Sequence, residues 1–166
     1  MKKTSVCILA LLFVIGLFFG CGNRAREEAR YTIKAQSLGE LMVQQASACV
    51  SQSKAYMAVW EYARVSEVDF QTAANEMLGA ETRANKATMV EHKGMIEDLL
   101  EELSDPSTDF ESTHDRLAEL YDIYVKLHDL AMDPSDDMRK HMETVDALYD
   151  QVLEKKRELD ATFAVR

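Results

Sequence analysis

The residues best suited to metal or acid–base chemistry are four histidines, each on or beside an apolar stripe with helical spacing. They are His92, His114, His128 and His141. Neutral imidazole is the commonest metal ligand in proteins. His114 and His128 are 14 residues apart, or roughly 21 Å along one helix, so the four cannot share one metal ion. We expect them to be structural residues at the border of a core.

Glu111 and His114 have the Glu-x-x-His spacing with which carboxylate-bridged di-metal bundles place two ligands on one helix face. Those sites need a second such pair and two further inward carboxylates, and the sequence has no second pair. His92 would approach His114 near one turn, and His128 would approach His141 near the next. The alternative to structural histidines is therefore a metal site at His92, Glu111 and His114.

The sequence carries no motif of a common catalytic or cofactor site. It lacks the Cys-x-x-Cys-His of haem attachment, the Walker loop, the Gly-rich dinucleotide turn, His-Glu-x-x-His and Gly-x-Ser-x-Gly. The acids Asp98, Glu101 and Glu102 are typical of a solvated helix end. We therefore expect neither an enzyme nor a bound cofactor.

The densest aromatic patch contains Tyr56, Met57, Trp60 and Tyr62. Tyr56 and Trp60 share a helix face because four residues separate them. Core packing is the default interpretation, since aromatic side chains dominate bundle cores. The alternative is a ligand pocket or a docking face for a partner at Tyr56 and Trp60.

Helical periodicity continues through nearly the whole chain after Asn23, which predicts an all-α protein. Asp105-Pro106 and Asp133-Pro134 each combine a capping residue with a proline suited to the first helical position. Short connections make neighbouring helices antiparallel. We therefore predict an antiparallel up-down bundle of three to four long helices, over residues 24–64, 67–103, 107–131 and 134–163.

The break between the first two helices is the least certain boundary, because residues 24–103 contain no proline. Ser66 and Asp69 resemble a capping box, and Val65 and Phe70 stand at the positions of a hydrophobic staple. Gly79 is the rival break, and a single continuous helix is the third possibility. The first two helices would be the longer pair, so that one of their ends projects.

The N-terminal segment reads as an export signal. Lys2 and Lys3 precede a 14-residue apolar run, residues 6–19, which is shorter than the roughly 20 residues that cross a bilayer. Leu17-Phe18-Phe19-Gly20-Cys21 then resembles a bacterial lipoprotein signal peptide. The resemblance implies cleavage after Gly20 and acylation of Cys21; an uncleaved signal anchor and a plain cleaved signal are the alternatives.

This division gives a signal peptide, residues 1–20, and an acidic helical domain, residues 21–166. The family pattern at Gly22 implies the outer membrane, facing the periplasm, in a Gram-negative cell; in a Gram-positive cell it would be the cell surface. Cys49 is the remaining thiol, and we expect either a buried side chain or an intermolecular disulfide.

The chain has a net charge of −10, and removing Lys2 and Lys3 with the leader makes it more acidic. Nucleic acid is disfavoured as a partner by repulsion. We expect the membrane, through lipid on Cys21, and another envelope protein as partners. The expected function is a protein-interaction or scaffold lipoprotein. The alternatives are a periplasmic four-helix bundle that senses a small ligand and a metal-binding bundle.

Overall fold

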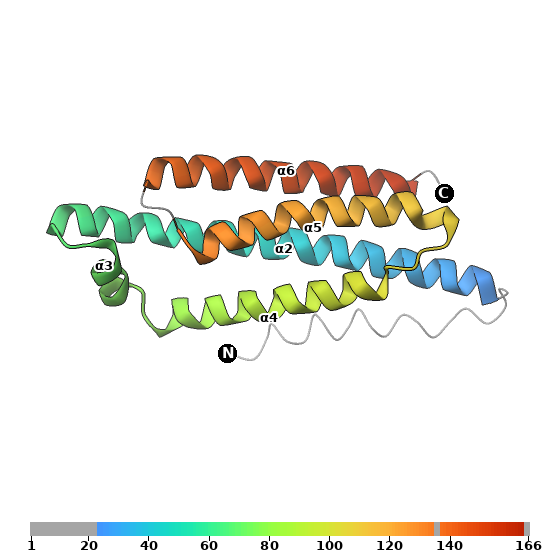
Figure 1. The fold of residues 1–166 in the computed structure, drawn as a ribbon, viewed down its shortest axis with the longest axis horizontal. Coiled ribbons are helices and arrows are strands. Elements are labelled where there is room, and N and C mark those ends of the chain that lie inside the picture. Colours follow the sequence, from blue (N-terminus) through green and yellow to red (C-terminus); the bar gives the residue numbers. More distant parts are fainter. Residues whose placement is uncertain (1–22, 135–136, 165–166) are drawn as a thin grey trace. The chain divides into compact units, whose positions relative to one another are not determined.

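The computed structural model describes residues 23–134 and 137–164, and 91% of these are helical, with no strand (Figure 1). The predicted all-α bundle is confirmed. None of the helices in these ranges is long and apolar enough to cross a membrane. The elements are α2 (Asn23–Ser66), α3 (Phe70–Met77), α4 (Ala80–Glu102), the 3-10 turn η2 (Thr108–Phe110), α5 (Glu111–Met132) and α6 (Met138–Ala164).

The structure divides into two units, the second starting at Ile33. The described part of the first unit is the beginning of α2. There Arg24 pairs with Glu28 at 2.8 Å, and the Thr32 hydroxyl donates to the Glu28 carbonyl. These are local contacts of one helix. The bundle, with every pocket considered below, belongs to the second unit.

Side-chain contacts show that α4, α5 and α6 run antiparallel in sequence. Between α4 and α5, the Tyr121 hydroxyl donates to Glu97 at 2.6 Å, and Lys86 donates to the Met132 carbonyl at 3.0 Å. Residue numbers therefore rise along one helix as they fall along the other. The α5–α6 contacts have the same order: Thr113 with Thr162, Arg116 with Glu158 and Glu119 with Lys155.

Helix α2 completes the ring by packing between α4 and α6. Lys34 pairs with Glu102 near the start of α2, and the Lys86 ammonium lies 5.3 Å from the Tyr56 ring further along. On the other side, Lys156 pairs with Glu40 at 2.7 Å, and Trp60 contacts His141. Each long helix of the second unit is thus antiparallel to both of its neighbours.

One face of each long helix forms the core. On α5 the buried positions follow three- and four-residue steps, as an amphipathic helix requires. They are Thr113, Leu117, Leu120, Tyr124, Leu127, His128 and Ala131. Matching stripes on the neighbouring helices include Leu38, Met42, Cys49 and Val59 of α2 and Val145, Val152 and Leu159 of α6.

The predicted break after Ser66 lies in the right place but closes differently. Glu67 has a left-handed backbone with φ 54°, and the Val68 N–H donates to the Ala63 carbonyl at 3.1 Å. This is the Schellman pattern, and Val68 packs with Ala63 as that motif requires. The helix therefore ends without the glycine that usually marks such a turn.

The predicted capping box and staple are wrong. Asp69, and not Ser66, caps α3 by accepting from the Thr72 N–H at 3.0 Å. Val65 is 67% exposed and cannot staple Phe70. Val68, the residue before the cap, takes that place and packs in one cluster with Ala73. The left-handed residue Glu67 shifts the cap by three positions.

The single helix predicted over residues 67–103 is also wrong, because Gly79 makes a second break. The short α3 folds against the last turns of α2 instead of continuing into α4. Its apolar residues Phe70, Ala73 and Ala74 pack with Val59 and Ala63. The projecting end expected for the first two helices is thus covered by α3.

Both prolines precede their helices by more than the sequence predicted. Pro106 lies before η2, so α5 begins at Glu111 and not near 107. Pro134 follows the end of α5, whose last residue is Met132. The Lys140 N–H bonds to the Asp137 carboxylate at 3.0 Å, so Asp137 replaces Asp133 as the cap of α6. Here the prolines terminate helices rather than open them.

Two helical glycines offer a matched test of the packing. A Cβ at Gly39 would lie 2.7 Å from Leu159 Cδ2, whereas one at Gly94 would meet nothing within 4 Å. Gly94→Ala should raise the free energy of unfolding by about 0.5–1 kcal/mol through helix propensity. The change in the free energy of unfolding for Gly39→Ala should be about 1–2 kcal/mol less favourable than for Gly94→Ala, because the Leu159 and Lys156 side chains must shift.

Urea unfolding followed by circular dichroism measures both variants. Equal stabilisation of the two would show that α2 does not approach α6 closely at Gly39. The comparison needs no knowledge of function.

Candidate functional site

Buried polar side chains with unused hydrogen-bonding capacity are concentrated in one layer of the bundle. Several such atoms have no partner among residues 33–134 and 137–164: Gln52 Nε2, Ser53 Oγ, Tyr56 Oη, His92 Nδ1, Tyr124 Oη and His128 Nε2. A buried polar group without a partner costs about 1–3 kcal/mol. Native folds contain few, and each calls for an explanation.

The helix register shows how close these groups are. Tyr56 lies level with Lys86 of α4, which in turn contacts the end of α5. The Tyr124 and His128 rings are 6.0 Å apart, and burial followed by the nearby Cys49 thiol raises the pKa of Tyr124. Carried across the bundle, this register places the six groups within roughly 15 Å along its axis. The layer therefore extends from the level of Tyr56, beside α3, to the middle of the bundle, where Tyr124 and His92 lie.

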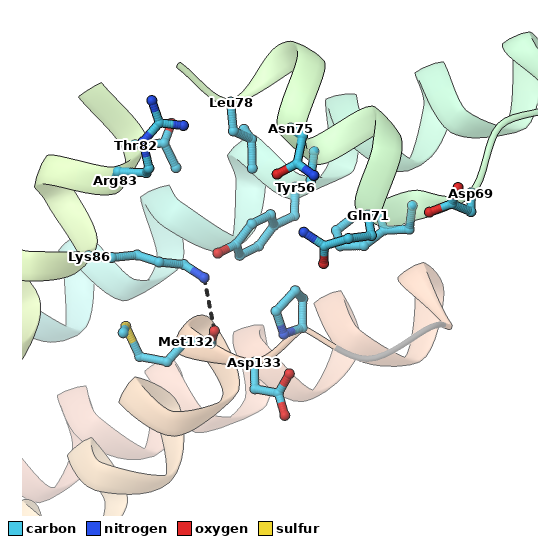
Figure 2. A pocket seen from close by; sticks show the side chains of 13 residues that line it. Tyr56, Asp69, Gln71, Asn75, Leu78, Thr82, Arg83, Lys86, Met132 and Asp133 are labelled. Carbon is cyan, nitrogen blue, oxygen red and sulfur yellow. Dashed lines mark hydrogen bonds between the residues drawn. The ribbon is translucent and has the colours of Figure 1, made fainter. Parts of the chain in front are cut away.

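A pocket of about 560 Å³ opens beside this layer. Tyr56 of α2 forms its floor, and α3, the start of α4 and the end of α5 form its walls (Figure 2). Its volume lies within the range of small-molecule sites. The polar lining residues are Tyr56, Asp69, Gln71, Asn75, Thr82, Arg83, Lys86 and Asp133.

Aromatic packing holds Tyr56 in this position. Its ring centroid lies 6.2 Å from that of Trp60 and 6.1 Å from that of Phe70, both edge-on. Only 2% of Tyr56 is exposed. Its hydroxyl points along the pocket toward Lys86 (Figure 2). A rigid ring with a free hydroxyl is a common element of binding sites.

The charged groups of the pocket are not paired with one another. Lys86 uses one N–H on the Met132 carbonyl, and no described side chain forms an ion pair with Arg83. Asp69 is committed to its cap: hydrogen bonds from the Thr72 hydroxyl and N–H hold the pKa of that carboxyl below its usual range. The Asp133 carboxylate points away from Tyr56 (Figure 2).

A second hollow of about 390 Å³ lies between α2 and α4 and also has Thr82 in its wall. Gln52 and His92 line it, together with the small residues Ala48 and Ser51. In this structure they form an indentation that continues from the first pocket toward the polar layer.

The residues predicted as a ligand or partner face are divided. Tyr56 lines the pocket, while Trp60 lies behind it, packed between Phe70 at 5.1 Å and His141 at 5.2 Å between centroids. Met57 and Tyr62, the other members of the patch, are partly exposed. Cys21 lies outside the described residues.

The predicted metal site is not brought together. His92 and His114 lie on opposite sides of the Tyr121–Glu97 contact, so they are about 18 Å apart along the axis. Glu111 is exposed. Nowhere in the described ranges do three His, Cys, Asp or Glu side chains converge as metal ligands. The sequence analysis allowed His92 and His114 to meet near the turn between their helices. The spacing within each helix does not determine the register between helices, and the register of α4 against α5 keeps the two side chains apart.

Cys49 is fully buried. Burial, with a smaller contribution from the Asp129 carboxylate, raises the pKa of its thiol to about 12. The folded protein therefore offers no thiolate for an intermolecular disulfide.

Arg83 and Lys86 were missed by sequence reasoning. They are the only Lys or Arg residues between Arg64 and Lys93, and three-residue spacing puts them on one helix face. That spacing is a usable signal. The pocket itself is not visible in the sequence, since it depends on how α3 folds back.

Comparison with known proteins returns no match to a family model, a curated protein or a solved structure.

Proposed function

We propose that this protein is an exported lipoprotein, held at the membrane by lipid on Cys21, whose bundle binds a small molecule under α3. The proposal develops the ligand-sensing alternative of the sequence analysis. The observation that carries it is the Tyr56 hydroxyl, which is buried, lines a pocket and has no partner in the described structure. The described fold therefore leaves this hydroxyl without an acceptor, which a ligand bound in the pocket would supply.

The architecture supports the same role. Walls from α2, α3, α4 and α5 meet at one pocket, so an occupant would contact four elements at once. Helix α3 has only eight residues and lies between two short non-helical connections. Short elements with few contacts are the ones that open most readily. Binding under α3 would stabilise its docked position.

A thermal-shift screen of small metabolites tests the proposal on the protein extracted in detergent. A ligand at 100 times its Kd adds about 2.7 kcal/mol to the folded state, which should raise Tm by several degrees. Tyr56→Phe should abolish or reduce the shift, whereas Tyr149→Phe on α6 should not. A screen without hits, or hits indifferent to Tyr56→Phe, would contradict the proposal.

A second candidate, the protein-interaction module expected from the sequence, rests on the α2–α3 tip. Val65 is exposed there, and Tyr62 bonds to Glu76 beside the partly exposed Met77. Such an apolar patch suits a protein contact. Crosslinking in membranes with a photoreactive residue at Val65, compared with one at Val90 on α4, distinguishes this role.

A further inference from the structure

We infer that the pocket beneath α3 binds a small monocarboxylate with an apolar body, its carboxylate held by Lys86 and the Tyr56 hydroxyl. The inference rests on the proposed function and adds the chemical class of the ligand.

Two cations are the first support. Arg83 and Lys86 are three residues apart on α4, and both line the pocket. The chain has 29 acidic residues against 19 Lys and Arg, yet no described acid forms an ion pair with either. Lys86 retains two of its three donors after its bond to Met132. Lys86 can therefore donate to an anion, and charge-assisted bonds of this kind are the strong ones. The Arg83 guanidinium points away from Tyr56 and Lys86 (Figure 2), so it adds positive charge to the lining without reaching that anion.

The Tyr56 hydroxyl adds a neutral donor at the same place. The Lys86 ammonium lies 5.3 Å from the centre of the Tyr56 ring, a cation–π distance that places it beside the tyrosine. Figure 2 shows the hydroxyl directed to the same side as Lys86. A carboxylate between them would give the buried hydroxyl the acceptor that the described protein does not.

The acids of the lining limit the charge of the ligand. Asp69 and Asp133 balance Arg83 and Lys86, so the lining as a whole is close to neutral. A dianion such as a phosphate ester would bring a second negative charge into a lining that already contains two carboxylates, and it would find only two donor groups, Lys86 and the Tyr56 hydroxyl. A monoanion avoids that repulsion, which is why we favour carboxylate over phosphate.

The remaining wall is apolar and suits the body of the ligand. Phe70, Ala74, Leu78, Met132 and Pro134 line it. Burying an aromatic or branched aliphatic group against these residues supplies affinity, while the two donors orient the ligand.

A charge series of one shape tests the inference by isothermal titration: phenylacetate, phenylacetamide and phenethylamine. Phenylacetate should bind, the amide roughly tenfold or more weakly, and the amine not measurably. Tyr56→Phe and Lys86→Gln should each weaken phenylacetate binding roughly tenfold. The control variants Tyr149→Phe and Arg139→Gln should leave its affinity unchanged.

Measuring the stability of the Tyr56→Phe variant distinguishes a role of the hydroxyl in binding from a role in folding. Tyr56→Phe should not lower the free energy of unfolding, because the lost hydroxyl has no partner in the described protein. Equal binding of the three compounds, or phenylacetate binding that neither Tyr56→Phe nor Lys86→Gln weakens, overturns the inference. So does a metabolite screen whose Tyr56-dependent hits are all uncharged or cationic, which leaves the proposed function standing. A screen without any hit removes both.

Discussion

Cys49 should react with a thiol reagent roughly a thousandfold more slowly in the folded protein than in guanidinium. The thiolate is the reacting species. Burial raises the pKa of this thiol to about 12, and Asp129 adds to the shift. At pH 8 the thiolate fraction is then about 10⁻⁴, against about a tenth or more for an unperturbed cysteine. The side chain is also fully buried by α2 and its neighbours.

The measurement uses a chain beginning at Gly22, in which Cys49 is the only cysteine. The reaction with Ellman's reagent is followed by the absorbance of the thiolate that the reagent releases. The rate should rise steeply with pH and reach the unfolded rate in denaturant. Fast labelling in buffer, or a disulfide-linked dimer on a non-reducing gel, would contradict the buried position. Such a dimer would instead support an intermolecular disulfide at Cys49, the alternative given in the sequence analysis.

Cys21→Ser should move the protein from the membrane fraction to the soluble fraction. One acyl chain gives only marginal membrane residence, and stable anchoring requires two signals, which a multiply acylated cysteine supplies. Serine keeps the size of the side chain but provides no thiol for acylation. Fractionation and labelling with an alkyne fatty acid measure location and lipid together.

Cys49→Ser is the matched control, since it removes a thiol far from the signal and should leave the protein at the membrane with its label. A Cys21→Ser protein that stays bound would favour the uncleaved signal anchor. A soluble wild-type protein without label would favour a plain cleaved signal.

Helical periodicity was sufficient to predict which residues are buried where one face of a helix packs on a continuous core. Leu117, Tyr124, His128 and Ala131 of α5 are buried at the three- and four-residue steps of a helical pattern. Each of these residues lies within an unbroken helix, so local spacing determines its neighbours. The same reasoning identified Tyr56 as a core aromatic and, as an alternative, as part of a pocket.

Local signals were insufficient where the chain reverses. Glu67 adopts a left-handed backbone with φ 54°, although its side chain disfavours that region by roughly 1 kcal/mol. Burial of Val68 and Phe70 with Val59 offsets this cost, and that packing is tertiary. His92 and His114 failed to meet for a related reason, because register depends on contacts between helices. The Lys86–Tyr56 pair is likewise formed only when α4 docks on α2.

Trp60 is a fluorescent reporter for the end of the bundle at which α3 docks. It is the only tryptophan of the chain, and its indole lies between Phe70 of α3 and His141 of α6. Intrinsic emission therefore comes from one place. Undocking of α3 would wet the indole and shift its spectrum to the red. Burial holds the pKa of His141 below its usual value, so quenching by a protonated imidazole should begin only in more acidic buffer.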